Sequence, residues 1–165
     1  MQVFFDDIAP GQRLPDASIG PISPAHIVRW SAAMENWHRI HYDERFARDH
    51  DGLDGLLVNG SWKQHILIRY LADWAGEQGW LGRLSMQFRA MSAVWETLVC
   101  HGEIISCARI GEWGSVLIRF GMTNADGTET APGTAMAVLP LRDGPALPYP
   151  PDAVMQDLPD MEAPA

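Results

Sequence analysis

Apolar residues recur with a helical period in the first half of the chain. Ser23-Pro24 has the pattern of a helix start, with Ser as the N-cap and Pro at the first helical position. Residues 25–35 are predicted to form a helix, because apolar side chains return there every three or four positions. The stripe consists of Ile27, Trp30, Ala33 and Met34.

A longer predicted helix begins at Ser61, interpreted as its N-cap, and ends between Gly76 and Gly79. Its apolar positions are Trp62, Ile66, Tyr70 and Trp74, with Leu67 and Leu71 beside them. This wide stripe predicts a helix that is buried on most of its circumference. The stretch between the two helices, residues 36–60, is rich in His, Asp and Gly and predicts a loop.

The second half of the chain alternates apolar and polar residues with period two, which predicts strands. A short strand is also predicted at residues 3–5, and a turn at 124–127. In the first strand of this second half Leu84, Met86, Phe88 and Ala90 share one face, and a long run over 95–107 follows. Val116, Ile118, Phe120 and Met122 share a face of the third strand, and Met136, Val138 and Pro140 belong to the last. Cys100 and Cys107 are an odd number of residues apart, so within one strand they are expected on opposite faces.

The order of these elements predicts an α+β fold, because helices come first and a run of antiparallel strands follows. A largely apolar helix needs a cover, and only a sheet curled around it is left to supply one. That arrangement is the hot-dog fold, whose sheets usually pair edge to edge in a dimer. We expect one such domain over residues 1–142 and a disordered, acidic, proline-rich tail over 143–165.

The charge composition of the chain argues against some classes of binding partner. The 165 residues include 12 Lys plus Arg against 21 Asp plus Glu, for a formal net charge of −9. A net-acidic chain without a basic run is a poor partner for nucleic acid or an anionic membrane. The acidic N-terminus lacks the features of a signal peptide, and two cysteines make no disulfide framework. We therefore expect a cytoplasmic protein.

Candidate chemistry concentrates in the predicted loop. The densest polar run is residues 35–43, which contains His38, His41 and Asp43. The histidines are either solvated loop residues or functional groups, and with Asp43 they are possible metal ligands. The spacing is weakly specific and no Cys or Glu cluster supports it, so we expect no metal. Ser61 lacks the Gly-x-Ser-x-Gly pattern of a hydrolase nucleophile.

The same run resembles the MaoC-like hot-dog hydratases and dehydratases, whose motif is Gly-Asp-x-Asn-Pro-x-His-x-Asp-x-x-x-Ala. His41-Tyr42-Asp43 and Ala47 match the end of that motif, and Val58-Asn59-Gly60 stands where Val-His-Gly is usual. Later matches are Trp95-Glu96-Thr97-Leu98, Thr123-Asn124-Ala125-Asp126-Gly127, Gly133-Thr134-Ala135 and Val138-Leu139-Pro140. The resemblance covers residues 4–141 and implies a hot-dog fold.

One difference from the family motif, at Asn36, indicates which branch of the family the chain resembles. The family has an acid five residues before the motif histidine, where this chain has Asn36, and an amide cannot take a proton. Asn-x-His-x-Ile-His-Tyr-Asp is, however, similar to the branch of 3-hydroxyacyl-thioester dehydratases and mesaconyl-CoA hydratase, in which Asn36 and His38 are the expected residue types. Asn59, where that branch tends to have His, departs from it.

The resemblance implies a hydro-lyase that adds water to an enoyl thioester, or removes it from a 3-hydroxyacyl thioester, in fatty acid metabolism. His41 is the expected acid/base, since an imidazole serves in either role near neutral pH. Asn36 would orient water or the thioester, with His38 as the second titrating group. Gly60 would donate its N–H to the enolate oxygen at the helix start. The acyl thioester is expected to contact Asp43, Ser61, Trp62 and Leu67.

No metal or redox cofactor is implied, and CoA or the phosphopantetheine of an acyl carrier protein enters only with the substrate. The expected assembly is a homodimer, a higher oligomer or a heterodimer with a homologue. Two alternatives stay open. A thioesterase of this fold often uses a carboxylate on the central helix, but Lys63, Gln64 and His65 stand there. A non-catalytic subunit would be consistent with Asn36 and Asn59.

Overall fold

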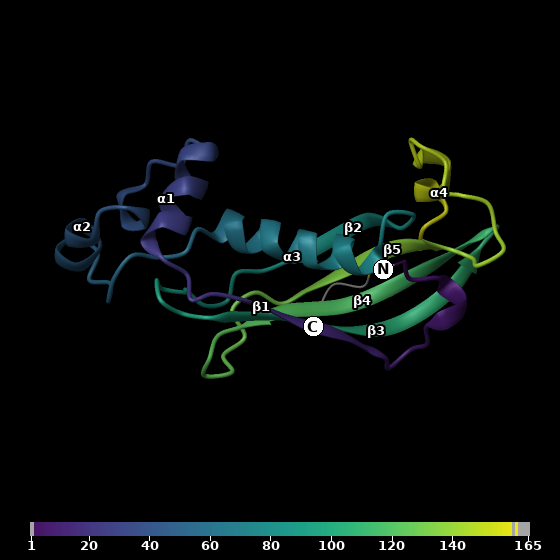
Figure 1. The fold of residues 1–165 in the computed structure, drawn as a ribbon, viewed down its shortest axis with the longest axis horizontal. Helices are drawn as coiled ribbons and strands as arrows, with labels where there is room; N and C mark the ends of the chain where they lie inside the picture. Colours follow the sequence, from purple (N-terminus) through teal and green to yellow (C-terminus); the bar gives the residue numbers. More distant parts are fainter. Residues whose placement is uncertain (1, 160, 162–165) are drawn as a thin grey trace.

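A five-stranded antiparallel sheet curls around one long helix in the computed structural model, which describes residues 2–159 and 161 (Figure 1). The elements are η1 (Phe5–Asp7), β1 (Arg13–Ile19), α1 (Pro24–Ala33), η2 (Arg39–His41), α2 (Glu44–Asp49), α3 (Gly60–Ala75), β2 (Trp80–Met86), β3 (Leu98–Ile110), β4 (Trp113–Thr123), β5 (Gly133–Pro140) and α4 (Asp152–Gln156). The strand order is β1-β3-β4-β5-β2. The predicted α+β architecture is confirmed.

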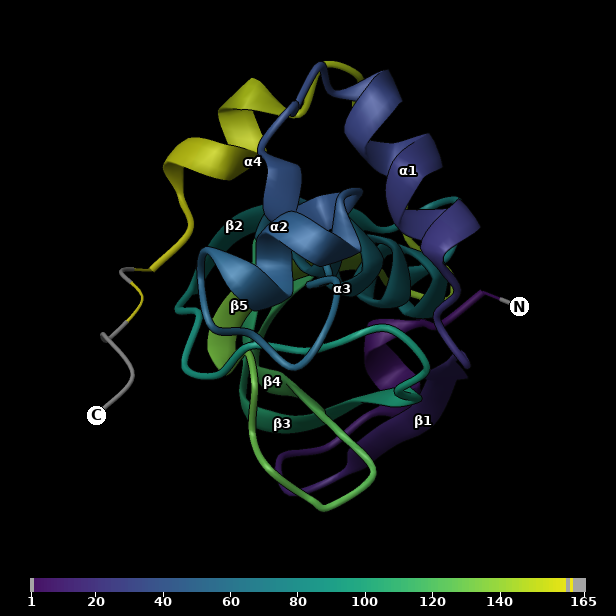
Figure 2. The ribbon, with the colours of Figure 1, turned by 90° about the vertical axis from the view of Figure 1, so that its left-hand side faces the viewer.

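The core lies between the inner face of the sheet and α3. Viewed nearly along α3, the strands surround the helix on the side away from α1 and α2 (Figure 2). The residues predicted to share a face of β4 are all buried there, and Leu67 and Leu71 of α3 pack in the same cluster. Burial of this apolar surface is the main driving force that holds the helix in the sheet.

Three predicted elements differ from the structure. The strand predicted at 3–5 is wrong: a 3₁₀ turn forms at Phe5–Asp7, and the first strand is β1. The period-two pattern does not reveal β1, because only Leu14 is buried in this strand. Its hydrogen-bonded pairing with β3 defines the strand instead. The strand predicted through Ala90 ends at Met86, and Phe88 is 56% exposed. Helix α2 forms inside the predicted loop.

The two cysteines also correct the sequence analysis. Cys100 is buried in the core, and Cys107 is half-buried against the same cluster. The register between β3 and β4 shifts between Ile104 and Ser106. Such a bulge adds one residue to the strand and reverses which side chains face inward, so counting residues across it fails.

The chain after residue 142 is partly ordered, in contrast to the predicted disordered tail. Helix α4 forms at 152–156, and Val154 and Leu158 are buried against Met136 and Val138 of β5. These few apolar residues lie among prolines and acidic residues, so the composition of residues 143–165 does not indicate an ordered segment. Residues 160 and 162–165 of the predicted tail lie outside the described part of the chain. None of the helices in the described residues is long and apolar enough to cross a membrane.

Candidate active site

His41 is the best-anchored of the predicted catalytic groups. The 3₁₀ turn η2 leaves only 8% of its surface exposed. Its Nδ1 lies 2.9 Å from the carbonyl oxygen of Leu57, and the Leu57 N–H donates to the Ile40 carbonyl at 3.0 Å. Two hydrogen bonds therefore join the histidine turn to the segment that leads into α3. Leu57 is three residues before Gly60, the first residue of that helix.

These contacts also set the proton state of the ring. A carbonyl oxygen only accepts, so Nδ1 carries the proton in this hydrogen bond. Nε2 of the neutral ring is then a free acceptor, and it makes no hydrogen bond within the described residues. Burial lowers the pKa of His41, while the bond to Leu57 opposes that shift and the charge of His38 adds to it. The arrangement favours a neutral imidazole that acts as a base.

Asn36 and His38 flank the same turn. The His38 and His41 rings lie 6.1 Å apart, centroid to centroid. The backbone N–H of His38 donates to Asn36 Oδ1 at 3.3 Å, which fixes the amide beside the turn. Within the described residues, Asn36 Nδ2 makes no hydrogen bond and remains a donor for another molecule. The His38 side chain is exposed to solvent.

Ser31 of α1 connects the two asparagines that depart from the family motif. Its carbonyl accepts from the backbone N–H of Asn36 at 2.9 Å, and its hydroxyl accepts from Asn59 Nδ2 at 3.1 Å. Asn59 is fully buried, and its Oδ1 has no partner in the described part of the chain. Asn36 and Asn59 are separate departures from the motif in the sequence, but the fold joins them through one buried serine.

The start of α3 differs from the prediction in one respect. Asn59 is the N-cap and Gly60 the first helical residue, so Ser61 is not the cap. The Ser61 hydroxyl instead accepts from the indole N–H of Trp30 at 2.9 Å, which docks α1 on α3. The first backbone N–H groups of a helix lack intrahelical partners, and the macrodipole makes this end attractive to negative charge. Gly60 stands at that end.

Phe88 closes over this helix start. A Cβ added to Gly60 would lie 3.3 Å from the Phe88 ring, which is tighter than ordinary contact. Glycine therefore lets the ring approach the backbone closely. Sequence analysis missed Phe88 as a site residue because alternation assigned it to the core face of a strand.

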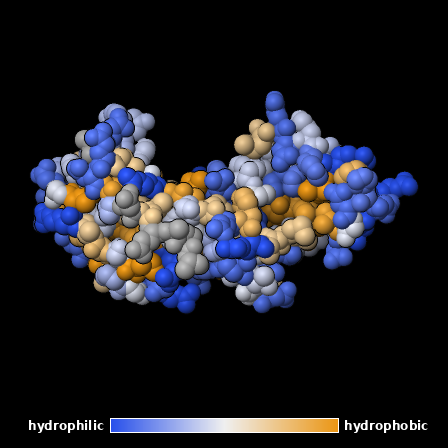
Figure 3. Space-filling model, turned by 180° about the vertical axis from the view of Figure 1, so that it is seen from behind, coloured by the Kyte–Doolittle hydropathy of each residue, from blue (hydrophilic) through white to orange (hydrophobic). Residues whose placement is uncertain are grey.

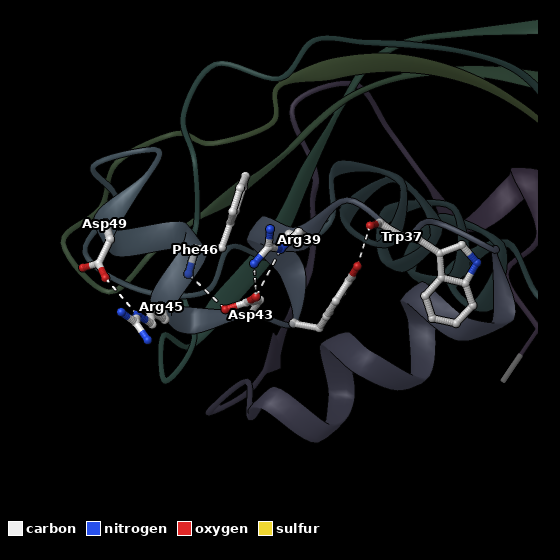
Figure 4. A network of polar contacts seen from close by, with 7 residues as sticks. Trp37, Arg39, Asp43, Arg45, Phe46 and Asp49 are labelled. Atoms are coloured by element: carbon white, nitrogen blue, oxygen red, sulfur yellow. Dashed lines mark hydrogen bonds and ion pairs between the residues drawn. The ribbon is translucent and has the colours of Figure 1, made fainter.

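Asp43 has a structural task that accounts for both of its oxygens (Figure 4). Oδ1 accepts from the backbone N–H of Phe46 at 2.9 Å and caps α2, and Oδ2 accepts from Arg39 at 2.7 Å. These two partners lower the pKa of Asp43. The expected contact between Asp43 and substrate stays a prediction, and the observed bonds fit a residue that shapes the turn. Within the described residues, no group of three or more His, Cys, Asp or Glu could hold a metal.

The two residues expected to contact the acyl chain lie in different places. Leu67 is fully buried between α3 and the sheet, so it belongs to the core. Trp62 lines two neighbouring clefts on the other side of α3, of about 310 and 400 Å³. The larger cleft runs beside β1 past Ile66 and Tyr70. These two clefts lie on the Trp62 face of α3.

Comparisons with known proteins agree with this architecture. The family model of hydroxyacyl-thioester dehydratase type 2 matches residues 12–96, just over half of the chain. The chain therefore belongs to the hydroxyacyl-thioester dehydratase type 2 family. No curated protein matches it by sequence.

Several solved structures share the fold. An (R)-hydratase from A. caviae involved in PHA biosynthesis is 17% identical, with a TM-score of 0.72 over 81% of this chain and 98% of that chain. A MaoC-like dehydratase from Rhodospirillum rubrum is 18% identical, with a TM-score of 0.73 over 85% and 98%. A chain of the ChsH1–ChsH2 complex from Mycobacterium tuberculosis is 19% identical, with a TM-score of 0.69 over 79% and 98%. The predicted hot-dog fold is confirmed, whereas the predicted branch within the MaoC-like proteins stays a prediction.

Proposed function

We propose that the protein is a hydro-lyase that hydrates an enoyl thioester or dehydrates the corresponding 3-hydroxyacyl thioester. The observation that carries the proposal is the buried His41, whose Nδ1–H is fixed on the Leu57 carbonyl just before the start of α3. Hydration needs a base for water and a donor for the thioester oxygen, and the bond to Leu57 ties the proposed base, His41, to the chain three residues before the proposed donor, Gly60.

In the hydration direction, His41 Nε2 takes a proton from the water that attacks the β-carbon. The π electrons move toward the thioester carbonyl, whose oxygen gains negative charge and accepts from the Gly60 N–H at the positive end of α3. Asn36 Nδ2 donates to the water or to the thioester. A proton then returns to the α-carbon from His41, and the exposed His38 exchanges protons with solvent.

The acyl group is proposed to lie along the Trp62 face of α3, where the open clefts are. The thiol carrier is CoA or acyl carrier protein. No metal or redox cofactor takes part in the proposed step, because each proton and electron pair is accounted for by the thioester, water and imidazole.

The proposed assembly is a homodimer. Figure 3 shows apolar side chains in and beside the shallow hollow between the two raised ends of the molecule. Large apolar side chains that remain exposed include Phe88, beside Gly60 at the start of α3, and also Met91 and Trp95. Exposed apolar surface of this kind is typical of a subunit interface. Light scattering at micromolar concentration should give twice the mass of the chain.

A panel of enoyl-CoA and enoyl-carrier-protein thioesters of increasing chain length tests the activity. Turnover appears as loss of the conjugated-thioester absorbance, with 3-hydroxyacyl product identified by mass spectrometry. Release of free thiol instead would identify a thioesterase. No reaction with any member would favour a non-catalytic subunit, a class to which the amides at Asn36 and Asn59 point. The ChsH1–ChsH2 neighbour is a complex of two different chains.

A further inference from the structure

Lys63 is the one lysine of the chain and lies buried in the first turn of α3, with only 2% of its surface exposed. Its Nζ donates to the Ala90 carbonyl at 2.9 Å, and to Ser92 Oγ and the Thr130 carbonyl at 3.4 Å. Three acceptors match the three N–H donors of an ammonium group, whereas a neutral amine has two. The geometry therefore fits a buried cation that is bonded to neutral oxygens.

A cation at this position is unfavourable for the helix. Burial lowers the pKa of Lys63, and a positive charge in the first turn opposes the macrodipole of α3. Glu96 and Glu129 raise the pKa of Lys63 through their charges. Their hydrogen bonds, however, go elsewhere: Glu96 accepts from the backbone N–H of Ala93, and Glu129 pairs with His101. An apolar side chain would suit the inward stripe of Leu67 and Leu71 better.

The segment that Lys63 holds is the one that covers the helix start. Phe88 contacts Gly60, and Ala90 and Ser92 bind the Lys63 ammonium. The Ser92 carbonyl also accepts from the backbone N–H of Val58 at 2.8 Å. One short stretch, residues 88–92, therefore connects the charge of Lys63 to the backbone around Gly60.

We propose that Lys63 is a positioning residue for the hydration step: its ammonium group holds residues 88–92 over the start of α3 and adds positive potential where the thioester oxygen becomes negative. The inference rests on the proposed function. Charge–charge interactions strengthen where water is excluded, so a buried cation on a residue one helical turn after Gly60 would stabilise the proposed oxyanion without touching it. A purely apolar residue would fill the same space and lack this effect.

Lys63→Gln separates the charge from the hydrogen bonds, because a glutamine amide still donates to the carbonyls. Arg119→Gln is the control, since it removes an exposed cation of β4 that lines neither cleft of the Trp62 face. We expect kcat of Lys63→Gln to fall about tenfold or more with KM within about twofold, and Arg119→Gln to keep both constants. Lys63→Arg should retain more of kcat than Lys63→Gln. An unchanged kcat in folded Lys63→Gln would overturn the proposal, as would an equal loss in Arg119→Gln.

A spectroscopic measurement tests Lys63 independently of turnover. The infrared C=O stretch of bound, carbonyl-labelled crotonyl-CoA falls in frequency as the carbonyl is polarised. In His41→Gln, which keeps the site but removes the base, we expect a downshift on binding that shrinks when Lys63→Gln is added. If wild type is inert while this difference is present, the proposed hydration fails, but polarisation of the thioester carbonyl by Lys63 stands. An equal downshift in both variants, or no bound thioester in either, would overturn the role of Lys63.

Discussion

The Nδ1–H of His41 donates to the carbonyl oxygen of Leu57 across 2.9 Å, in a pair of residues 16 positions apart. This bond fixes the tautomer of the imidazole and the position of the chain just before α3. The proposed base and the proposed oxyanion donor thus depend on one connection. A change at His41 is expected to affect chemistry first and the fold second.

His41→Gln should lower kcat by about 10²- to 10⁴-fold, the usual contribution of a general base. Glutamine can still donate to the Leu57 carbonyl, so the melting temperature should change little. His50→Ala serves as the control, because it removes an exposed histidine outside the site. Steady-state kinetics on the best thioester substrate, with circular dichroism in parallel, makes the comparison. Near-normal turnover of a folded His41→Gln variant would exclude the acid/base role.

The pH dependence follows from the lowered pKa of His41. The neutral ring is the base, so the hydration rate should rise with pH through a midpoint below the ordinary histidine value of about 6.5. Stability has the same sign: the unfolded chain binds this proton more tightly, so the free energy of unfolding falls as the pH drops through that midpoint. In His41→Gln, the part of this decrease in the free energy of unfolding that comes from His41 should be absent.

Asn36→Asp should move the rate midpoint to higher pH, because a carboxylate beside the imidazoles favours their protonated forms. His38→Ala should move it in the same direction, since the charge of His38 contributes to the low pKa of His41. Asn36→Ala is the neutral control and should lower the rate without displacing the midpoint. A rate midpoint that neither Asn36→Asp nor His38→Ala displaces would contradict the two-histidine mechanism.

The sequence predicted the fold where one physical signal dominated. The alternation in β4 reflects continuous burial, and the structure confirms it. The four-residue repeat correctly predicted the helix α3 but not its buried face: Trp62, Ile66, Tyr70 and Trp74 are only half-buried, and the fully buried stripe is Lys63, Leu67, Leu71 and Ala75. The failures have local causes. Asn59 replaced Ser61 as the N-cap although its side chain makes no cap hydrogen bond, so only backbone geometry reveals it. The bulge after Ile104 reversed the face of Cys107 without any glycine or proline to mark it.

For similar reasons, the sequence indicated some residues of the candidate site and not others. The resemblance to the family motif predicts roles for His41, Asn36 and Gly60, because the backbone segments that carry these residues lie within the part of the chain that the resemblance covers. Lys63 falls on the same inward stripe as Leu67, four residues later, and that coincidence of a charge with a buried stripe was the available signal. Phe88 gave no signal, since its contact with Gly60 depends on tertiary structure.

Gly60→Ala tests how closely the site is packed. The new methyl group would press on the Phe88 ring at about the 3.3 Å contact, so the ring must move. We expect kcat/KM to fall about tenfold or more because the thioester oxygen is displaced from its donor. Adding Phe88→Leu should recover part of the loss. Gly55→Ala, whose added Cβ would meet its nearest neighbours at 3.7 Å or more, should have wild-type kinetics.

Exhaustive chelation tests the proposed absence of a metal. His38, His41 and Asp43 are the residues a metal would need, yet Asp43 has both oxygens engaged and His41 Nδ1 is bonded to Leu57. We expect dialysis against a chelator to leave kcat within about twofold of the untreated enzyme. Loss of activity that zinc or manganese restores would show that a metal takes part.

A substitution in the segment around α4 is expected to change the stability of the fold without changing the activity. Leu158 is buried against the outer face of the sheet, and an added Cβ at Gly82 of β2 would meet its side chain. Leu158→Ala should therefore lower the free energy of unfolding by about 2 kcal/mol, as truncation of a buried leucine does. The exposed Gln156→Ala, two residues away, should change it by less than about 0.5 kcal/mol. Both variants should keep the wild-type kcat, because α4 lies at the opposite end of the molecule from η2 and the start of α3 (Figure 1). Denaturant titration makes the comparison, and equal stability of the two variants would mean that residues 152–158 do not pack on the sheet in solution.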